Sequence, residues 1–305
     1  MKVLIVSSYN NQRFAPFITE QVDALRAAGC DVVYFGVKGK GIKGYMRSSP
    51  ALKTKIQDWN PDVIHAHYGL CGLLANLQRR VPVVTTYHGS DINLRKVRPF
   101  SRLSVLLSSF NIFVSRKTLD IIRPRKGYAL MPCGVDLIPL QLTDKAEARR
   151  KMGLDPQKKY VLFSGAFDNT VKNYPLAKAA VDLIPDAELI ELKGYSREQV
   201  TLLMCAVDVL IMTSFTEGSP QVVKEAMACG CPVVSVDVGD VKDVVCGVDG
   251  CYICERSASE LAGCIKSVFL NNRRTNGRKR IQELRLDNVD IAKRLISIYE
   301  GLLTA

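Results

Sequence analysis

Short apolar runs alternate along the chain with longer segments that carry helical periodicity. Residues 2–8 form a continuous apolar run, and residues 16–28 place Phe17, Val22 and Leu25 at helical spacing. Further β-branched runs, with helix-length segments between them, occupy residues 32–35, 62–66, 81–86 and 110–114. Continuous apolar strands separated by helices predict a parallel sheet that is covered on both faces.

The same alternation restarts in the second half of the chain. It breaks at residues 132–136, and a polar helix is expected at residues 144–152. New apolar runs follow at residues 160–164, 188–192, 207–212 and 233–236. The pattern predicts an α/β protein with two doubly wound, Rossmann-like domains facing a central cleft, at residues 1–140 and 141–290. An amphipathic helix in residues 291–305 is expected to pack back across that cleft.

Composition narrows the class of protein. The chain has 305 residues, of which 47% are hydrophobic, and this share excludes a disordered chain. No apolar run reaches the length of about 18 residues that a membrane helix needs. The first apolar run also turns polar too early for a secretory leader. These features predict a cytoplasmic protein.

The positive charge of the chain is confined to its first half. Residues 1–140 hold 20 Lys and Arg against 8 Asp and Glu, whereas residues 141–305 hold 22 of each kind. A general solubility charge would not be divided in this way. The asymmetry predicts an anionic partner for the first domain, which could be nucleic acid, a phosphorylated substrate or an acidic membrane surface.

All three histidines follow predicted strands, where open α/β sheets bind their ligands. His65 and His67 lie at the end of one apolar run, and His88 precedes a glycine turn after the next. For His88 the position favours a functional role over a structural one. For His65 and His67 both interpretations stay open.

Two sequence patterns match the spacing of known binding motifs but lack the structural context that those motifs require. Cys229 and Cys231 precede Cys251 and Cys254 at a spacing that loosely resembles a zinc site, but strand alternation would point the last two to opposite faces. We therefore expect reduced, structural cysteines and no metal. Residues 39–44 match G-x-G-x-x-G, yet they follow the second strand, and helix signals resume only near residue 49. We predict a mobile basic loop there instead of a dinucleotide site.

The strongest local signal is the segment 216–230. Ser219 is a suitable N-cap, Pro220 suits the first helical position, and Gly230 suits the C-terminal end of the helix. The backbone N–H groups of the first turn would then form an anion site that suits phosphate. Glu217 and Glu225 flank these donors, and their carboxylates suit sugar hydroxyl groups. Phosphate donors beside hydroxyl acceptors predict a nucleotide-sugar.

The same segment resembles a known family. Glu217 to Glu225 match the E-x7-E motif of retaining family-4 glycosyltransferases, and the Ala-Met-Ala-Cys-Gly-Cys-Pro-Val-Val that follows is typical of them. Other resembling pieces lie, in order, at residues 63–69, 88–91, 132–136 and 163–173. The resemblance spans essentially the whole chain. It implies the GT-B fold, in which the N-terminal domain binds the acceptor and the C-terminal domain binds the donor.

The resemblance also implies a role for individual residues. Glu225 would bind the ribose, and Glu217 with the backbone of Gly218, Ser219 and Pro220 would hold the donor sugar. The diphosphate would lie against Lys172, beside Gly165, and against the amides of Gln221, Val222 and Val223. His88 would face the transferred sugar, so that the expected catalytic residues are His88, Lys172 and Glu217. In the other domain, His67 and Asp91 would contact the acceptor.

One position departs from the family pattern. The family usually places an arginine after the glycine that Gly165 matches, and this chain has Ala166 there. Phosphate binding would then depend on Lys172 and the helix, or on another basic residue. The front-face mechanism that the family implies uses neither a carboxylate nucleophile nor a metal, because stabilising the departing diphosphate does most of the work.

The expected partners follow from these features. They are a nucleotide-sugar donor, a glycan or lipid-linked acceptor and, through the basic N-terminal domain, an anionic membrane surface at the inner face of the membrane. We expect a hexosyl- or other glycosyltransferase of polysaccharide or glycoconjugate biosynthesis that needs no cofactor. A non-catalytic nucleotide-sugar-binding protein is the main alternative. A nucleic-acid-binding protein is less favoured, because no stacking platform or recognisable motif accompanies the charge.

Overall fold

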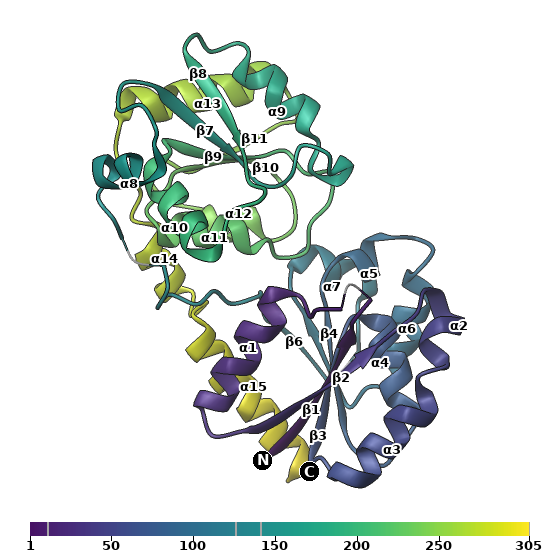
Figure 1. Ribbon diagram of the computed structural model, residues 1–305. Coiled ribbons are helices and arrows are strands. Elements are labelled where there is room, and N and C mark those ends of the chain that lie inside the picture. The colour runs from purple at the N-terminus through teal and green to yellow at the C-terminus, as the bar shows by residue number, and fades with distance from the viewer. Residues whose placement is uncertain (11, 126, 141, 305) are drawn as a thin grey trace. The chain divides into compact units, whose positions relative to one another are not determined.

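The computed structural model describes residues 1–10, 12–125, 127–140 and 142–304. The chain divides into two compact units. The N-terminal unit comprises Met1–Gly134 with Asn288–Ala305, and the C-terminal unit comprises Val135–Asp287. Each unit is a parallel sheet with helices on both faces, so the predicted α/β class is confirmed (Figure 1). The last helix belongs to the N-terminal unit.

The N-terminal sheet has the strand order β2-β1-β3-β4-β5-β6, and all its pairs are parallel. Its strands are β1 (Lys2–Ser8), β2 (Asp31–Val37), β3 (Val63–His67), β4 (Val83–Tyr87), β5 (Phe110–Phe113) and β6 (Tyr128–Leu130). Strands β3 and β4 are buried along their whole length. This burial explains their near-continuous apolar sequence, because a central parallel strand has no face toward water.

Eight helices of the described residues belong to this unit. They are α1 (Pro16–Ala27), α2 (Gly41–Met46), α3 (Ser49–Trp59), α4 (Gly69–Asn76), α5 (Ser90–Asn93), α6 (Arg98–Leu107), α7 (Arg116–Ile122) and α15 (Asn288–Leu303). Helix α15 lies beside α1 on one face of the sheet (Figure 1). Helices α4 and α6 pack very closely. Glycine is required at the contact, since a Cβ on Gly69 or Gly72 would collide with Ser101 or Ser104.

The basic glycine segment 39–44 corrects one expectation. It is not a loop that continues to residue 49, since α2 begins at Gly41. Gly39 has a φ of +125°, and a Cβ on it would lie 2.8 Å from the Cα of Gly44. The side chain of Asn10 closes the turn, because its Nδ2 donates to the Gly39 carbonyl at 3.0 Å and its Oδ1 accepts from the Gly39 amide at 2.7 Å. These glycines therefore serve a tight turn after β2.

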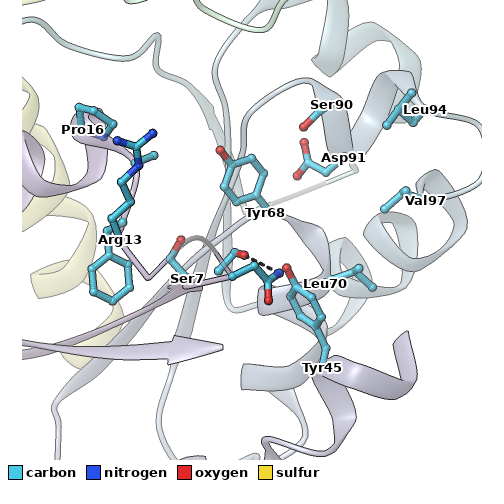
Figure 2. A pocket seen from close by; sticks show the side chains of 14 residues that line it. Ser7, Arg13, Pro16, Tyr45, Tyr68, Leu70, Ser90, Asp91, Leu94 and Val97 are labelled. Atoms are coloured by element: carbon cyan, nitrogen blue, oxygen red, sulfur yellow. Dashed lines mark hydrogen bonds between the residues drawn. The ribbon is translucent and has the colours of Figure 1, made fainter. Parts of the chain in front are cut away.

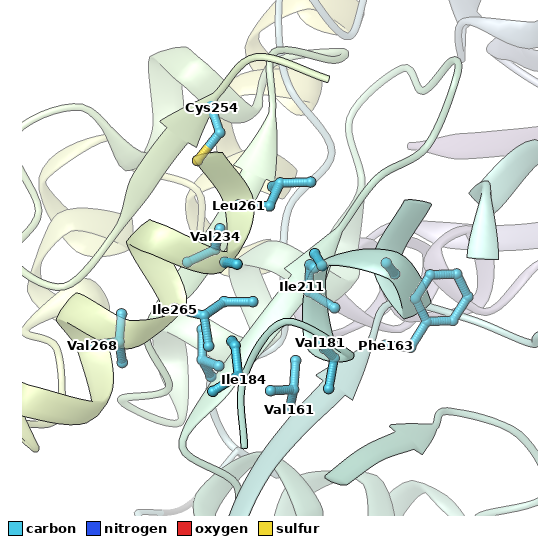
Figure 3. Packing of buried hydrophobic residues seen from close by; sticks show 14 residues of the cluster. Val161, Phe163, Val181, Ile184, Ile211, Val234, Cys254, Leu261, Ile265 and Val268 are labelled. Carbon is cyan, nitrogen blue, oxygen red and sulfur yellow. The ribbon is translucent and has the colours of Figure 1, made fainter. Parts of the chain in front are cut away.

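The C-terminal sheet has the order β11-β10-β9-β7-β8, and its strands are again parallel. They are β7 (Lys159–Phe163), β8 (Ala187–Glu191), β9 (Val209–Met212), β10 (Val233–Val236) and β11 (Tyr252–Cys254). The helices are α8 (Lys145–Met152), the 3-10 turn η1 (Thr170–Lys172), α9 (Tyr174–Val181), α10 (Arg197–Ala206), α11 (Gln221–Ala228), α12 (Val241–Val245), α13 (Ala258–Asn271) and α14 (Gly277–Glu283). Figure 3 shows the core between α9, α13 and the sheet, where Val161, Ile211 and Ile265 meet.

The two sheets share one topological feature that positions the sites. Strand order reverses between β1 and β3 in the N-terminal sheet and between β7 and β9 in the C-terminal sheet. In open parallel sheets such a switch point opens a crevice at the carboxyl ends of the strands. The loops after β1, β3, β7 and β9 are therefore where ligand-binding residues are expected. Among the described residues, no helix is long and apolar enough to cross a membrane.

Candidate functional site

The β7/β9 switch point brings together three of the predicted donor residues. Lys172 follows β7 at the end of η1, and Glu217 follows β9. The Nζ of Lys172 donates to Oε1 of Glu217 at 2.7 Å, and the two side chains are 19% and 17% exposed. A Cβ on Gly165 would lie 3.1 Å from Cγ of Lys172, so glycine at this position lets the lysine pass. At the position of the missing arginine, the Ala166 carbonyl accepts from the Asn169 amide at 3.1 Å.

Helix α11 begins one residue later than the sequence predicts. Pro220 is its N-cap and no side chain caps it, so the prediction that Ser219 is the N-cap is wrong. The hydroxyl of Ser219 is instead held by two buried charges, since it donates to Oδ2 of Asp240 at 2.6 Å and accepts from Nζ of Lys224 at 2.5 Å. The first turn contains Gln221, Val222 and Val223, whose amides lie at the positive end of the helix.

A buried ion pair supports the loop in front of this helix. Lys224 is fully buried, and its Nζ lies 2.9 Å from Oδ2 of Asp240. Gly239 lies against the same loop, since a Cβ there would lie 2.6 Å from the carbonyl oxygen of Gly218. Burying two charges adds little stability by itself. The arrangement fixes the backbone of Gly218 and Ser219, for which the family resemblance implies contact with the donor sugar.

The second carboxylate of the motif is also paired. Oε1 of Glu225, on α11, accepts from Nη1 of Arg197 at 2.5 Å, and the Glu225 side chain is only 8% exposed. The site residues predicted from the sequence did not include Arg197, Lys224 and Asp240. A lysine on an otherwise apolar helix face was a signal for Lys224, whereas nothing in the sequence pairs Arg197 with Glu225.

The β1/β3 switch point of the N-terminal unit carries a cavity of about 500 Å³. Figure 2 shows its lining, to which the ends of β1 and β3 and the turn after β4 contribute. The lining includes Ser7, Arg13, Tyr68, Leu70, Asp91 and Leu94. This cavity lies entirely within one unit, at the place where the resemblance expects the acceptor.

Asp91 is a buried carboxylate, and no cation pairs with it among the residues that the structure describes. Its Oδ2 accepts from the Gly69 amide at 2.9 Å and its Oδ1 from the His88 amide at 3.0 Å. Burial raises the pKa of Asp91 to about 6, although the hydrogen bonds from backbone amides act in the opposite direction. The structure thus places Asp91, one of the two predicted acceptor residues, on the cavity.

The three histidines form a stack behind this cavity. The rings of His65 and His67 lie 4.6 Å apart, and those of His67 and His88 lie 5.2 Å apart. His65 is held between the hydroxyls of Tyr299, at 2.5 Å, and Thr86, at 2.8 Å. Burial lowers the pKa of His65 and of His88 to about 3 and that of His67 well below its usual value. All three rings are therefore neutral near pH 7.

His67 and His88 contact each other within the stack. His67 is completely buried, and its Nδ1 lies 3.0 Å from Nε2 of the partly exposed His88. Its Nε2 has no hydrogen-bond partner among the described residues, and because an unpaired acceptor costs less than an unpaired donor, we assign the proton to Nδ1. His67 then donates to His88 and orients that ring.

The cysteines show no metal site in the part of the chain that the structure describes, where no group of three or more His, Cys, Asp or Glu side chains could hold an ion. All ten cysteines are free thiols. Cys231 is buried, whereas Cys251 lies near the hydroxyl of Thr275 and Cys254 contacts the sulfur of Cys264 at 3.3 Å.

Comparison with known proteins gives the same division of the chain. A family profile described as Glycosyltransferase Family 4 matches residues 15–138, and one described as Glycosyl transferases group 1 matches residues 173–271. A Bacillus subtilis protein named as the teichuronic acid biosynthesis glycosyltransferase TuaC is 28% identical over 250 residues, which cover 72% of this chain and 64% of that protein. The chain thus spans less than two thirds of this relative.

Solved structures match over nearly the whole chain. Sucrose-phosphate synthase from Thermosynechococcus elongatus superposes with a TM-score of 0.88 at 19% identity, covering 100% of this chain and 99% of that one. Anabaena HepE, in complex with UDP, gives 0.80 at 17% identity, covering 99% and 100%. The two parallel sheets and these likenesses define a protein of the GT-B fold. The chain belongs to the family-4 glycosyltransferases.

Proposed function

We propose that the protein is a retaining glycosyltransferase that moves a sugar from a nucleotide-sugar to a glycan or lipid-linked acceptor. The observation that carries this proposal is the Lys172–Glu217 pair at the β7/β9 switch point, next to the first turn of α11. A lysine and a helix N-terminus suit a diphosphate, and a carboxylate beside them suits sugar hydroxyls. The solved HepE structure contains UDP, and the relative TuaC is named as a teichuronic acid biosynthesis glycosyltransferase.

The ion pairs near the β7/β9 switch point indicate how a nucleotide-sugar donor would bind. The ammonium of Lys172 can turn from Glu217 to a phosphate oxygen, which frees the Glu217 carboxylate for a sugar hydroxyl. Glu225 would accept from the ribose hydroxyls while Arg197 holds its other side in place. The Lys224–Asp240 pair keeps the loop Gly218–Ser219 in position throughout, since it is fully buried.

The reaction needs no acid or base from the protein. The acceptor oxygen attacks the anomeric carbon from the face on which the diphosphate leaves, and the bond from that carbon to the phosphate oxygen breaks. The acceptor proton passes to the departing phosphate oxygen. Lys172 and the first-turn amides of α11 stabilise the negative charge on the diphosphate. Because these groups take the place of a divalent ion, we propose that no metal is required.

The N-terminal unit adds a proposed contact with an anionic membrane. It contains 22 Lys and Arg against 9 Asp and Glu, whereas the C-terminal unit contains 20 against 21. Leu94, Leu103 and Leu106 are 53%, 45% and 80% exposed on and before α6. Exposed cations lie among them at Arg95, Lys96 and Arg102. Cations mixed with exposed leucines suit an interface that is anionic outside and apolar beneath.

The donor is tested first. Thermal unfolding is measured with UDP-, GDP- and ADP-linked sugars, where a ligand at 100 times its Kd adds about 2.7 kcal/mol. The stabilising donor is then supplied with a glycan acceptor in EDTA, and the anomeric configuration of the product is read by NMR. We expect transfer with retention and without metal. Binding without transfer would support the non-catalytic alternative, inversion would exclude the proposed mechanism, and activity only with Mg²⁺ or Mn²⁺ would exclude the metal-free diphosphate site.

A further inference from the structure

The N-terminal cavity contains a buried hydroxyl that lacks a partner. Ser7 ends β1 and is 1% exposed, and its Oγ has no hydrogen-bond partner in residues 1–10, 12–125, 127–140 and 142–304. Ser7 and Tyr68 both belong to the lining of the cavity (Figure 2). Buried polar groups are nearly always hydrogen-bonded in folded proteins. A cavity ligand with a hydroxyl group would satisfy it.

Tyr68 reaches the cavity at a conformational cost. Its backbone has a φ of 72° and a ψ of 148°, which a bulky side chain rarely adopts. Two hydrogen bonds hold it there, since its amide donates to the Thr86 carbonyl at 2.9 Å and its carbonyl accepts from the Gly72 amide at 2.9 Å. Glycine would adopt this backbone freely, yet the chain has a tyrosine whose phenol lines the cavity. Strain of this kind is concentrated at functional sites.

The lining of the cavity is polar in the middle, cationic on one side and apolar on the other. Asp91 has its carboxylate fixed by backbone amides, so its remaining lone pairs can accept from a ligand. Arg13 is the cation of the lining, and it makes no hydrogen bond or ion pair with any described residue. Leu94 and Val97 lie on the other side of Tyr68 from Arg13 (Figure 2).

We propose that this cavity binds an acceptor sugar that carries one anionic group and an apolar aglycone. Ser7, Tyr68 and Asp91 bind its hydroxyl groups, Arg13 binds the anion, and Leu70, Leu94 and Val97 contact the aglycone. The carboxylate of Asp91 repels a second anion, so the anionic group of the ligand is directed toward Arg13. That the ligand is the acceptor rests on the proposed function, whereas the chemistry of the cavity does not.

Binding to the full chain tests the proposal without a donor. The probes are 4-nitrophenyl glucuronide, 4-nitrophenyl glucoside, which lacks the anion, and free glucuronate, which lacks the aglycone. Calorimetry should show the glucuronide as the tightest ligand, with the other two each about 5- to 10-fold weaker. In Arg13→Ala the glucuronide should bind no more tightly than the glucoside. Ser7→Ala and Tyr68→Phe should weaken both 4-nitrophenyl probes alike.

Lys53→Ala is the matched control, because Lys53 is an exposed cation on α3 and is not part of this cavity. It should leave all three affinities unchanged. Equal affinity of the wild-type chain for glucuronide and glucoside, or an unchanged difference in Arg13→Ala, would overturn the proposal. So would the absence of binding by every probe in a protein that still binds its nucleotide-sugar. Conversely, probe binding without any nucleotide-sugar binding would count against the proposed function and leave this cavity assignment standing.

Discussion

The buried carboxylates have different kinds of partner at the two switch points. At the β7/β9 switch point three carboxylates have cationic partners, because Glu217 pairs with Lys172, Glu225 with Arg197 and Asp240 with Lys224. At the β1/β3 switch point Asp91 is held by backbone amides, and the neighbouring histidines are neutral. The same topology thus supports two different kinds of site.

The difference matches the ligands proposed for the two regions. A site for a diphosphate needs cations that can move to the ligand, and a carboxylate partner keeps such a cation in place until the ligand arrives. A site for sugar hydroxyls needs acceptors that no ion pair has already satisfied. Amides can hold a carboxylate without neutralising it, and Asp91 keeps its capacity to accept. Breaking these arrangements one at a time should therefore give different results in the two units.

The largest effect is expected for Lys172. Lys172→Ala removes the side chain that stabilises the departing diphosphate, and loss of such a donor typically lowers kcat by about 10²–10³. Glu217→Gln should also lower transfer strongly, because it removes a charge at the donor sugar. Neither side chain lies in the core, so the melting temperature should change little. Steady-state kinetics and calorimetry on the same preparations measure both.

Lys178→Ala is the control for this experiment. Lys178 is an exposed lysine on α9 that pairs with Asp182 at 2.7 Å, so its removal takes away an equivalent pair outside the site. It should leave kcat unchanged. Wild-type turnover in Lys172→Ala and Glu217→Gln would show that the Lys172–Glu217 pair has no part in the reaction.

The donor region was the more predictable of the two from sequence. Local signals identify it, since Glu217, Pro220 and Gly230 lie within one helix and its preceding loop. The Ser219 cap was predicted wrongly because the competing partners, Lys224 and Asp240, come from the helix interior and from a later loop. Arg197 was missed for the same reason. Its pairing with Glu225 is a tertiary contact between α10 and α11.

The N-terminal cavity depends on features that a sequence does not display. The histidines at strand ends were recognised, but not that they stack on one another. The role of Tyr68 rests on a positive φ, which sequence rules assign to glycine or asparagine. Ser7 belongs to the first apolar run, and nothing in that run indicates that its hydroxyl lacks a partner. The fold itself was predicted well where strands are long and apolar, whereas the short strand β6 and the helix α2 within the glycine segment were not.

A smaller effect is expected for the stability of the N-terminal unit as a function of pH. The pKa of Asp91 is about 6 when folded against a usual 3.8, so the folded state binds this proton more tightly. The group therefore adds stability below pH 3.8 that is lost as the pH rises through 6. Relative to Asp91→Asn, the unfolding free energy of the wild type should fall by about 2 kcal/mol between pH 4 and pH 6.

The comparison with Asp91→Asn is needed because other groups near Asp91 titrate differently. His65 and His88 have lowered pKa values, so their contribution to stability is lost as the pH falls below 6.5. Tyr68, Cys71 and Tyr87 have raised pKa values and stay protonated over this range. Chemical denaturation at several pH values, taken as the difference between the two proteins, isolates Asp91. Parallel profiles would mean that the carboxylate is solvated in the folded protein.

The smallest effect per residue is expected for binding to anionic membranes, which we predict for the basic N-terminal unit and not for the C-terminal unit. Lys38, Lys40 and Lys43 lie exposed around the glycine turn after β2. A cation near an acidic leaflet contributes about 1 kcal/mol, so each Lys→Gln change should weaken binding to anionic vesicles about fivefold. The binding should be reversed by salt, because exposed charges are screened over about 8 Å at physiological ionic strength. Vesicle sedimentation at several salt concentrations measures it.

Lys279→Gln supplies the control, since it removes an exposed lysine from the C-terminal unit, whose charges balance. It should bind vesicles as the wild type does. Leu106→Ser should weaken binding without changing its salt dependence, because Leu106 is 80% exposed and contributes apolar contact only. Equal binding to neutral and anionic vesicles would remove the role of the lysines. No binding to either at low salt would mean that the positive charge of the N-terminal unit serves a soluble acceptor, and that the anion bound at Arg13 arrives from solution.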